Sequence, residues 1–444
     1  MIVGTDAVRS VKSADSAGWS NPVRDRTRWG VWRRGKTAIL SLLAIAASLE
    51  ATAQPFTLET AVARALARNA GIAAMQSGIE EAQGRRRQAG LLPNPEIETE
   101  FAPNSRGREF LLGIGVNQPV PLGPRRRLER AVADTTVAVA HAEVRAAERH
   151  LALAVRSAAI RLLAVDAQRD LVERQFEAAR QRLKVSDEAA ARGEASTIEA
   201  MQLRLELGQL DLSLDHLRSE RSAIVGTLAP MLGLSPSDPL EIRDTLDPPA
   251  PPGALPPTTA AAIPTAPDAT VATRRIDLAE READLARARR WEQPTFGIFG
   301  ELQRMEDVPV GLENDVWVGL RLKIPLPLWD RQRGRIDEAA AAIRRRGWEA
   351  ESVHRHLAAE AATAHREMIV AAERHARLTE SLLPQSEAVE NQLASGHRNG
   401  QFPLGELLRA REARLALEAA RIEALRDFHL ARVRHESVTG LTQP

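Results

Sequence analysis

The sequence contains no cysteine and no tyrosine, and aromatic residues make up only 3% of its 444 positions. Without cysteine the chain can form no disulfide, offers no thiolate to a metal ion and has no thiol that could carry a lipid anchor. Few aromatic residues, together with abundant alanine and arginine, favour long helices that pack through small side chains.

The sequence also lacks an excess of charge and a long apolar run. The formal net charge is +1 although 27% of the residues are charged, so no overall field would attract nucleic acid. No run of 18 or more apolar residues occurs, which excludes an ordinary membrane-spanning helix. The ten histidines are scattered, and His354 and His356 point to different sides of a helix. We therefore predict no metal site, no cofactor and no catalytic site: the protein is not expected to be an enzyme.

The N-terminus has the pattern of an export signal. Arg33, Arg34 and Lys36 precede the apolar run "AILSLLAIAASL", and small residues follow in the "ATA" at 51–53. A positive region, a short apolar region and an A-x-A site together predict that residues 1–53 are a signal peptide. The mature protein is then expected to work outside the cytoplasm.

The mature sequence repeats itself with a period of about 206 residues. The segment "QPVPLGPRRRLERA" at 118–131 matches "IPLPLWDRQRGRIDEA" at 324–339, with Pro119 against Pro325 and Pro121 against Pro327. We predict a first repeat at 54–247 and a second at 268–444, joined by the proline-rich linker 248–267.

Each repeat reads as a helix, two strands, a very long helix, a tight turn and a returning helix. The strands show period-two alternation and are predicted at about 95–101, 109–118, 294–302 and 315–324. The long helical hairpins are predicted at about 125–232 and 331–438. Strands of about 9–10 residues can cross a bilayer when they are tilted.

Two details of the helices follow from proline and from spacing. The first helix is predicted at 57–90, and a helix at about 331–394 is expected to bend at Pro384. Apolar residues separated by four and three positions run from Leu151 to Leu183, which predicts a coiled-coil seam.

The first strand carries three carboxylates on one side. Glu96, Glu98 and Glu100 alternate with the less polar Ile97, Thr99 and Phe101. Four strands in one chain would leave open edges, which lipid does not tolerate, so strands of several chains must close one barrel. Two chains would give eight strands and a filled interior, whereas three give twelve strands and a pore.

In such a barrel the three glutamates are expected to line the water-filled lumen. Arg321 and Lys323 are predicted to face inward as well and to offset part of that charge. Two interpretations stay open: the acids favour cations, or they only hydrate a polar lumen.

Four segments carry a family resemblance: "AGLLPNPEIETEF" (89–101), "NQPVPLGPRRR" (117–127), "ARGEASTIEA" (191–200) and "IPLPLWDRQRGRI" (324–336). With them the chain resembles the TolC family of outer-membrane efflux ducts over 56–442, and within it the CzcC-type proteins of heavy-metal efflux systems. The resemblance implies a mainly α-helical homotrimer with a twelve-stranded membrane β-barrel on a long α-helical barrel. It implies a passive duct in the outer membrane of a Gram-negative bacterium, in contact with outer-membrane lipid. A periplasmic adaptor (membrane fusion protein) and an inner-membrane, proton-driven RND-type pump are the implied partners.

The two hairpin turns are the second candidate site. Gly193 and Gly400 stand where a helix must reverse, and glycine supplies the left-handed conformation that ends a helix. This structural role alone would explain both residues. The resemblance implies in addition that the turns form the periplasmic tip, where adaptors dock and the tunnel narrows.

The resemblance also assigns charged residues to the tip. Glu406 aligns with an acidic residue of the family's constriction, and Glu199 is its counterpart in the first repeat. Arg409 stands where some relatives carry a second acid. A ring of Glu406 side chains either selects cations or is paired with Arg409 or Arg398.

Two other functions stay open at this point. A periplasmic coiled-coil adaptor or scaffold also has long helical hairpins, although such proteins usually have one hairpin and a lipoyl-like domain. A duct of the same fold could instead carry drugs or other organic cargo. The sequence does not distinguish zinc, cobalt, cadmium, copper or silver from organic compounds.

Overall fold

The structure is a computed structural model that describes residues 55–121, 123–192, 196–235, 238–249, 265–307 and 309–439. The predicted signal peptide, Gly193 and most of the predicted linker lie outside these residues. The described elements are α2 (Leu58–Arg68), α3 (Ala70–Gln88), β1 (Glu96–Pro103), β2 (Phe110–Pro119), α4 (Arg125–Ala191), α5 (Thr197–Met231), α6 (Pro267–Ala288), β3 (Thr295–Asp307), β4 (Gly311–Lys323), α7 (Arg333–Arg377), a π-helical segment (Leu378–Leu382), α8 (Leu383–Arg398) and α9 (Leu404–Thr439). Long helices with one small antiparallel sheet confirm the predicted fold class.

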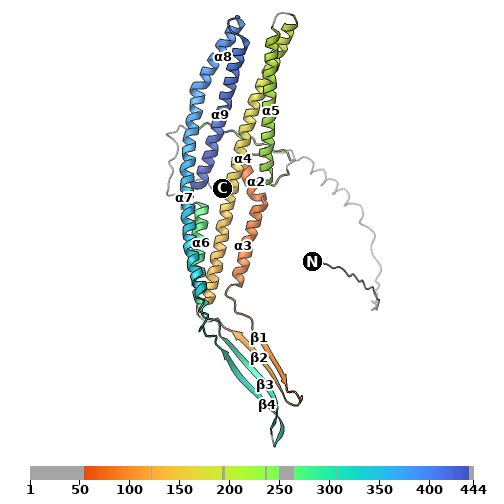
Figure 1. Ribbon diagram of the computed structural model, residues 1–444, viewed down its shortest axis with the longest axis vertical. Coiled ribbons are helices and arrows are strands. Elements are labelled where there is room, and N and C mark those ends of the chain that lie inside the picture. Colours follow the sequence, from red (N-terminus) through yellow and green to blue (C-terminus); the bar gives the residue numbers. More distant parts are fainter. Residues whose placement is uncertain are drawn as a thin grey trace, which may run out of the picture. The chain divides into compact units, whose positions relative to one another are not determined.

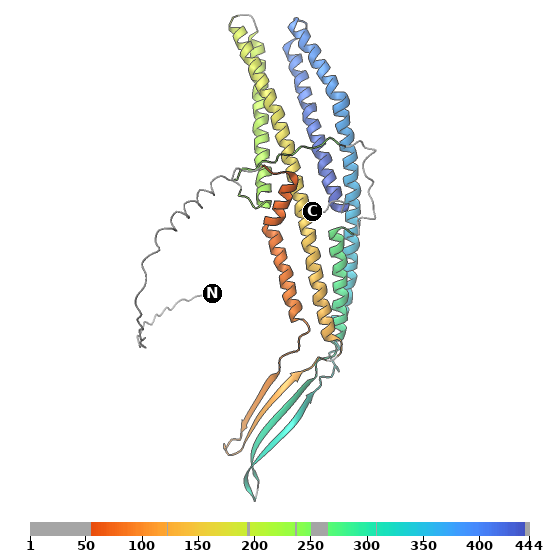
Figure 2. The same ribbon diagram turned by 180° about the vertical axis from the view of Figure 1, so that it is seen from behind.

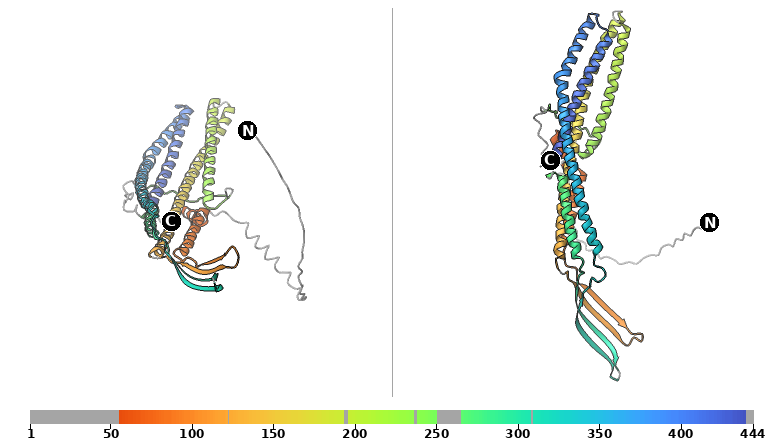
Figure 3. Two further views of the ribbon diagram at one scale, coloured as in Figure 1. Left: turned by 60° about the horizontal axis from the view of Figure 1, so that its bottom comes forward. Right: turned by 60° about the vertical axis from the view of Figure 1, so that its left-hand side comes forward.

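The four strands form one antiparallel sheet in the order β1-β2-β3-β4. The central pair, β2 with β3, joins a strand of the first repeat to a strand of the second. Figure 1 shows the strands side by side, and Figure 3 shows that they bend in a common direction. The outer edges of β1 and β4 have no partner strand among the described residues.

The second strand pair is longer than the sequence predicts. β3 continues to Asp307 and β4 begins at Gly311, beyond the expected limits 302 and 315. The pairing extends through Met305 with Glu313 and Glu306 with Leu312. Backbone hydrogen bonds sustain a strand in which the apolar alternation has already faded, so the sequence pattern underestimates its length.

Next to the sheet, α3, α4, α6 and α7 lie side by side in this order (Figures 1 and 2). α4 packs further along its length against α5 and α9, and α7 packs against α9. At 1.5 Å per residue, the 67 residues of α4 span about 100 Å. No helix in the described part of the chain is long and apolar enough to cross a membrane.

Small and branched apolar residues form the helix contacts. The predicted seam of α4 is largely buried: Val155 and Leu162 have no exposed surface, and Val165, Val172 and Ala179 are also buried. Around Leu162, the core adds Leu228 of α5 and Ala65 of α2. Seam positions recur about once per helical turn, which keeps one side of α4 against its neighbours along its length.

The predicted helix 57–90 is wrong in one respect, because it is two helices. Asn69 separates α2 from α3 with extended backbone angles, φ −72° and ψ 121°. Its side-chain oxygen accepts hydrogen bonds from the backbone N–H groups of Gly71 (2.9 Å) and Ile72 (3.2 Å). Asparagine favours such a helix start because it satisfies N–H groups that have no partner inside the helix.

The helix predicted at 331–394 is interrupted where proline was expected to bend it. The π-helical segment Leu378–Leu382 lies between α7 and α8, just before Pro384. Proline has no N–H to donate to the carbonyl group of Glu380, so the regular hydrogen-bond ladder cannot continue there.

Candidate functional site

The strand register gathers the predicted lumen residues on one face of the sheet. One row across the sheet runs from Glu96 through Asn117 and Gly297 to Arg321. The next row on the same face runs from Glu98 through Gly115 and Phe299 to Gly319. Glu100 and Lys323 belong to the same face, because side chains two residues apart on a strand point the same way. The five residues are thus brought together, and their role in a lumen stays a prediction.

The predicted site residues leave out further acids of this face, among them Glu301 and Asp315. Glu301 lies in the row of Glu100, and Asp315 lies one row further toward the strand turn. The alternation of Phe296, Ile298 and Leu302 in β3 already places Glu301 on the opposite side, so the signal was in the sequence.

Arg321 neutralises part of the acidic charge. Its guanidinium forms an ion pair with Glu98, and Asn117 Nδ2 donates a 2.8 Å hydrogen bond to the same carboxylate. The guanidinium also lies 5.1 Å from the ring centroid of Phe299. Because both partners of the pair are about half exposed, the pair adds little stability. Within the described residues Glu96 and Glu100 have no ion-pair partner.

The other face of the sheet is apolar and exposed. The exposed fraction is 84% for Leu320, 80% for Val318 and 73% for Ile97. Val116, Ile298 and other apolar residues complete the same rows. A contiguous apolar face of this kind on a protein surface marks a region covered by lipid or by a partner.

Helix α8 ends just before the predicted glycine, which begins the turn to α9. Gly400 has φ +72°, and its N–H donates to the carbonyl group of His397 at 2.9 Å. The next N–H, of Gln401, donates to the carbonyl group of Gly396 at 2.8 Å. These two hydrogen bonds form a Schellman motif, in which a left-handed residue stops the helix. The structural role expected for Gly400 is therefore present.

Glu199 and Glu406 occupy the first turns of α5 and α9, where the helix dipole favours an acid. Both are half-buried. Arg409 Nε instead donates to the carbonyl group of Gly405 at 3.2 Å, and Arg398 Nε donates to Ala394. Among the described residues, neither arginine pairs with Glu406, so the proposed neutralisation of this carboxylate within one chain is absent.

Apolar contacts join the two hairpins near these turns. Leu203 of α5 is buried with Leu404 and Leu407 of α9, and Leu183 and Leu393 pack against them. These leucine contacts thereby join α5 to α9 close to the N-terminal ends of both helices within one chain.

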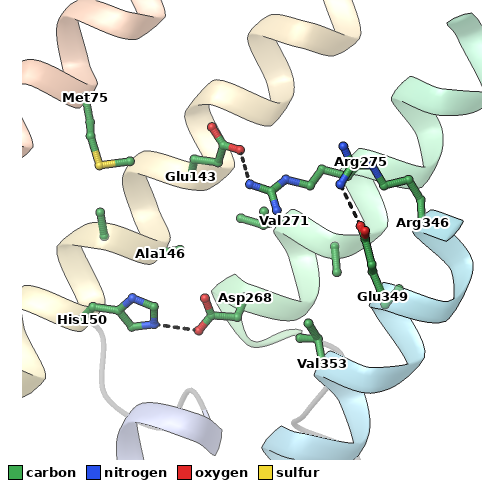
Figure 4. Close-up of a pocket in the computed structure, with 13 residues that line it drawn as sticks. Met75, Glu143, Ala146, His150, Asp268, Val271, Arg275, Arg346, Glu349 and Val353 are labelled. Atoms are coloured by element: carbon green, nitrogen blue, oxygen red, sulfur yellow. Dashed lines mark hydrogen bonds and ion pairs between the residues drawn. The ribbon is translucent and has the colours of Figure 1, made fainter. Parts of the chain in front are cut away.

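A polar pocket of about 480 Å³ lies on the helical layer, lined by α3, α4, α6 and α7 (Figure 4). His150 Nε2 is 2.9 Å from Asp268 Oδ2, and Arg275 donates to Glu143 at 2.7 Å. Both contacts tie α4 to α6. No three His, Asp or Glu residues in the described part of the chain are placed to hold a metal ion.

Histidines of the helical layer respond to pH in opposite directions. The hydrogen bond to Asp268 raises the pKa of His150. This contact therefore stabilises the fold below the ordinary histidine pKa and is lost as pH rises through the folded-state value. Burial lowers the pKa of His435, assisted by the nearby His365. Protonation of His435 thus disfavours the folded state as pH falls below the ordinary histidine value.

A sheet with one charged and one apolar face, carried on long helical hairpins, is the arrangement expected of a channel-type membrane protein. The Outer membrane efflux protein family matches residues 261–441. The cobalt-zinc-cadmium resistance protein CzcC of Cupriavidus metallidurans is 25% identical over 412 residues, which cover 88% of each chain.

Solved structures share the fold. The outer membrane protein VceC of Vibrio cholerae aligns with a TM-score of 0.69 at 15% identity, over 86% of this chain and 96% of that chain. CusC, whose structures concern folding and transmembrane channel formation, aligns with a TM-score of 0.70 at 14% identity, over 88% and 95%. The resemblance to TolC-type efflux proteins is confirmed, and this chain is an outer-membrane efflux channel component rather than an enzyme.

Proposed function

We propose that this chain forms the outer-membrane duct of a heavy-metal efflux system. The observation that supports this cargo most directly is the 25% identity to a cobalt-zinc-cadmium resistance protein over most of both chains. The acidic sheet face is consistent with cations, because carboxylates in a narrow aqueous cylinder lower the energy of positive ions. The duct is passive, so a periplasmic adaptor and an inner-membrane pump of the RND type would drive transport.

The assembly that follows is a homotrimer. One chain supplies four strands with free edges at β1 and β4. Pairing β4 of one copy with β1 of the next in three copies closes twelve strands and leaves no edge in the membrane. The apolar face that carries Leu320 and Ile97 would then meet lipid, and the face that carries Glu96 and Arg321 would meet water.

Loss of the gene is expected to lower tolerance to one or more of zinc, cobalt, cadmium, copper and silver, with unchanged tolerance to organic antibiotics. The reason is that the duct supplies the only continuous aqueous path for its own pump. Growth of the deletion strain, with and without a plasmid that restores the gene, measures this. Loss of tolerance to antibiotics alone would assign an organic cargo instead.

The triple substitution of Glu96, Glu98 and Glu100 by glutamine is expected to lower the cation preference of the open channel. It removes the negative potential of the lumen without changing side-chain size. Reversal potentials of single channels in a salt gradient measure the effect. Arg321→Gln is the matched control and should shift the potential in the opposite direction, because it frees the Glu98 carboxylate. Unchanged potentials in both variants would mean that these acids only hydrate the wall.

A further inference from the structure

A groove of about 750 Å³ lies where the sheet meets the helices. The start of α4, the end of α6 and the adjoining ends of β3 and β4 line it. Its apolar wall consists of Trp291, Phe296, Leu322 and Ile324, each about half or more exposed. A volume of this order is typical of sites for small organic ligands.

The apolar wall continues the membrane face of the sheet. Phe296 pairs with Leu322 in the register, two positions from the pair Ile298 and Leu320. Side chains two positions apart on a strand share a face, so the groove opens on the same side as the exposed apolar rows. Trp291 stands at its edge, and tryptophan is enriched where an apolar layer meets water. A molecule in this groove would therefore lie at the boundary of the bilayer.

The rim of the groove carries one unpaired charge of each sign. Arg127 of α4 and Glu292 are exposed and have no ion-pair partner among the described residues. Arg287 and Asp284, also at the rim, pair with each other at 2.8 Å. The free groups thus complement a ligand with one anionic and one cationic group.

A second copy of the chain fits this groove less well than a small lipid-like molecule does. α4 and α6 are the inner pair of the helical layer, whereas α3 and α7 lie at its outer sides. Copies that join through the free sheet edges would meet along α3 and α7, away from the junction of α4 with α6. The chain also has no cysteine to carry a covalent acyl anchor, so any tightly held lipid must be bound without a covalent bond.

We propose that this groove binds one zwitterionic phospholipid of the periplasmic leaflet in each chain. Arg127 holds the phosphate, Glu292 holds the ammonium group, and the wall from Trp291 to Ile324 takes an acyl chain. The inference rests on the proposed function, since it requires that the sheet forms a membrane barrel.

For the test, the full-length trimer is extracted from outer membranes in a mild detergent. Native mass spectrometry then counts the phospholipids bound to it. We expect the wild type to retain one added phosphatidylethanolamine per chain and to prefer it to phosphatidylglycerol. Arg127→Glu combined with Trp291→Ala should reduce the retained lipid about tenfold, because a charge-assisted contact is lost. Glu292→Gln should abolish the preference between the two lipids. Adding inorganic phosphate should not displace the lipid, since the acyl chain contributes to binding.

The control variants carry the same types of substitution, arginine to glutamate and tryptophan to alanine, at residues outside the groove. Arg281→Glu reverses an exposed charge on α6, and Trp348→Ala removes an exposed tryptophan from α7. Both should retain lipid as the wild type does. Glutamate at position 127 suits the first turn of a helix, so a folding defect is not expected to explain the loss.

The outcomes separate this inference from the proposed function. A conducting trimer that holds no phospholipid, or holds it equally in the groove variants, would overturn the lipid site alone. Displacement by phosphate would also overturn it, because the acyl chain would then contribute nothing to binding and the groove would be an anion site. A wild-type chain that forms no trimer in the membrane would overturn the proposed assembly.

Discussion

Replacing Val318 by arginine is expected to remove the protein from the outer membrane, whereas the same replacement at Trp317 should leave it there. Val318 and Trp317 are neighbours on β4 and are 80% and 60% exposed, but they lie on opposite faces of the sheet. An arginine on the lipid face of a barrel costs about 2–4 kcal/mol near the bilayer midplane. Three copies multiply this cost in one trimer to about 6–12 kcal/mol, which is comparable to the whole stability of an ordinary protein.

The measurement is the amount of each variant in the outer-membrane fraction after a urea wash, together with the heat-sensitive trimer band on a gel. Leu320→Arg, on the same apolar face, should repeat the result of Val318→Arg. If the Trp317→Arg variant were missing from the outer-membrane fraction and the Val318→Arg variant were present, the two faces of the sheet would be assigned the wrong way round. Retention of all three would contradict a membrane barrel.

Replacing Leu162 by alanine is expected to lower the free energy of unfolding by about 2–5 kcal/mol, the usual cost of an unfilled cavity in a core. Leu162 has no exposed surface and belongs to the cluster that joins α2, α4 and α5. The loss combines the transfer energy of the deleted methyl groups with contacts that rigid neighbours cannot recover.

Thermal or urea unfolding of the purified variant in detergent, followed by circular dichroism at a helix wavelength, measures this change. Leu212→Ala is the matched control, since Leu212 lies on α5 and is 72% exposed. It should shift the midpoint little. Equal shifts for the two variants would mean that the cluster around Leu162 does not limit the stability of the helical part.

Much of this fold could be predicted because its sequence patterns are long. The seam from Leu151 to Leu183 repeats over many turns, and each strand shows period-two alternation. The break at Asn69 was missed because a single polar residue does not disturb the helical periodicity around it. Its effect comes from a side chain that satisfies two backbone N–H groups, which a periodic pattern does not report.

The sequence predicts which residues share the candidate site, but it does not predict which of them form ion pairs. Period-two alternation gathers Glu96, Glu98 and Glu100, but only the register across three strand pairs brings Glu98 to Arg321. Those residues are 223 positions apart, a separation at which sequence spacing carries no information. The same holds for Glu406: among the described residues, Arg398 and Arg409 turn to backbone carbonyl groups of their own helices and do not pair with it.

The pairing of β2 with β3 has a consequence for how the protein is made. Phe110 meets Arg304 in this ladder, so β2 and β3 cannot pair until the chain has been made at least as far as Arg304. Such distant contacts form slowly, because closing a long loop costs entropy before any contact repays it. During that delay each strand exposes unpaired edges and an apolar surface, and both features promote aggregation of incompletely folded chains. The chain is therefore most prone to aggregation in the interval before β2 pairs with β3.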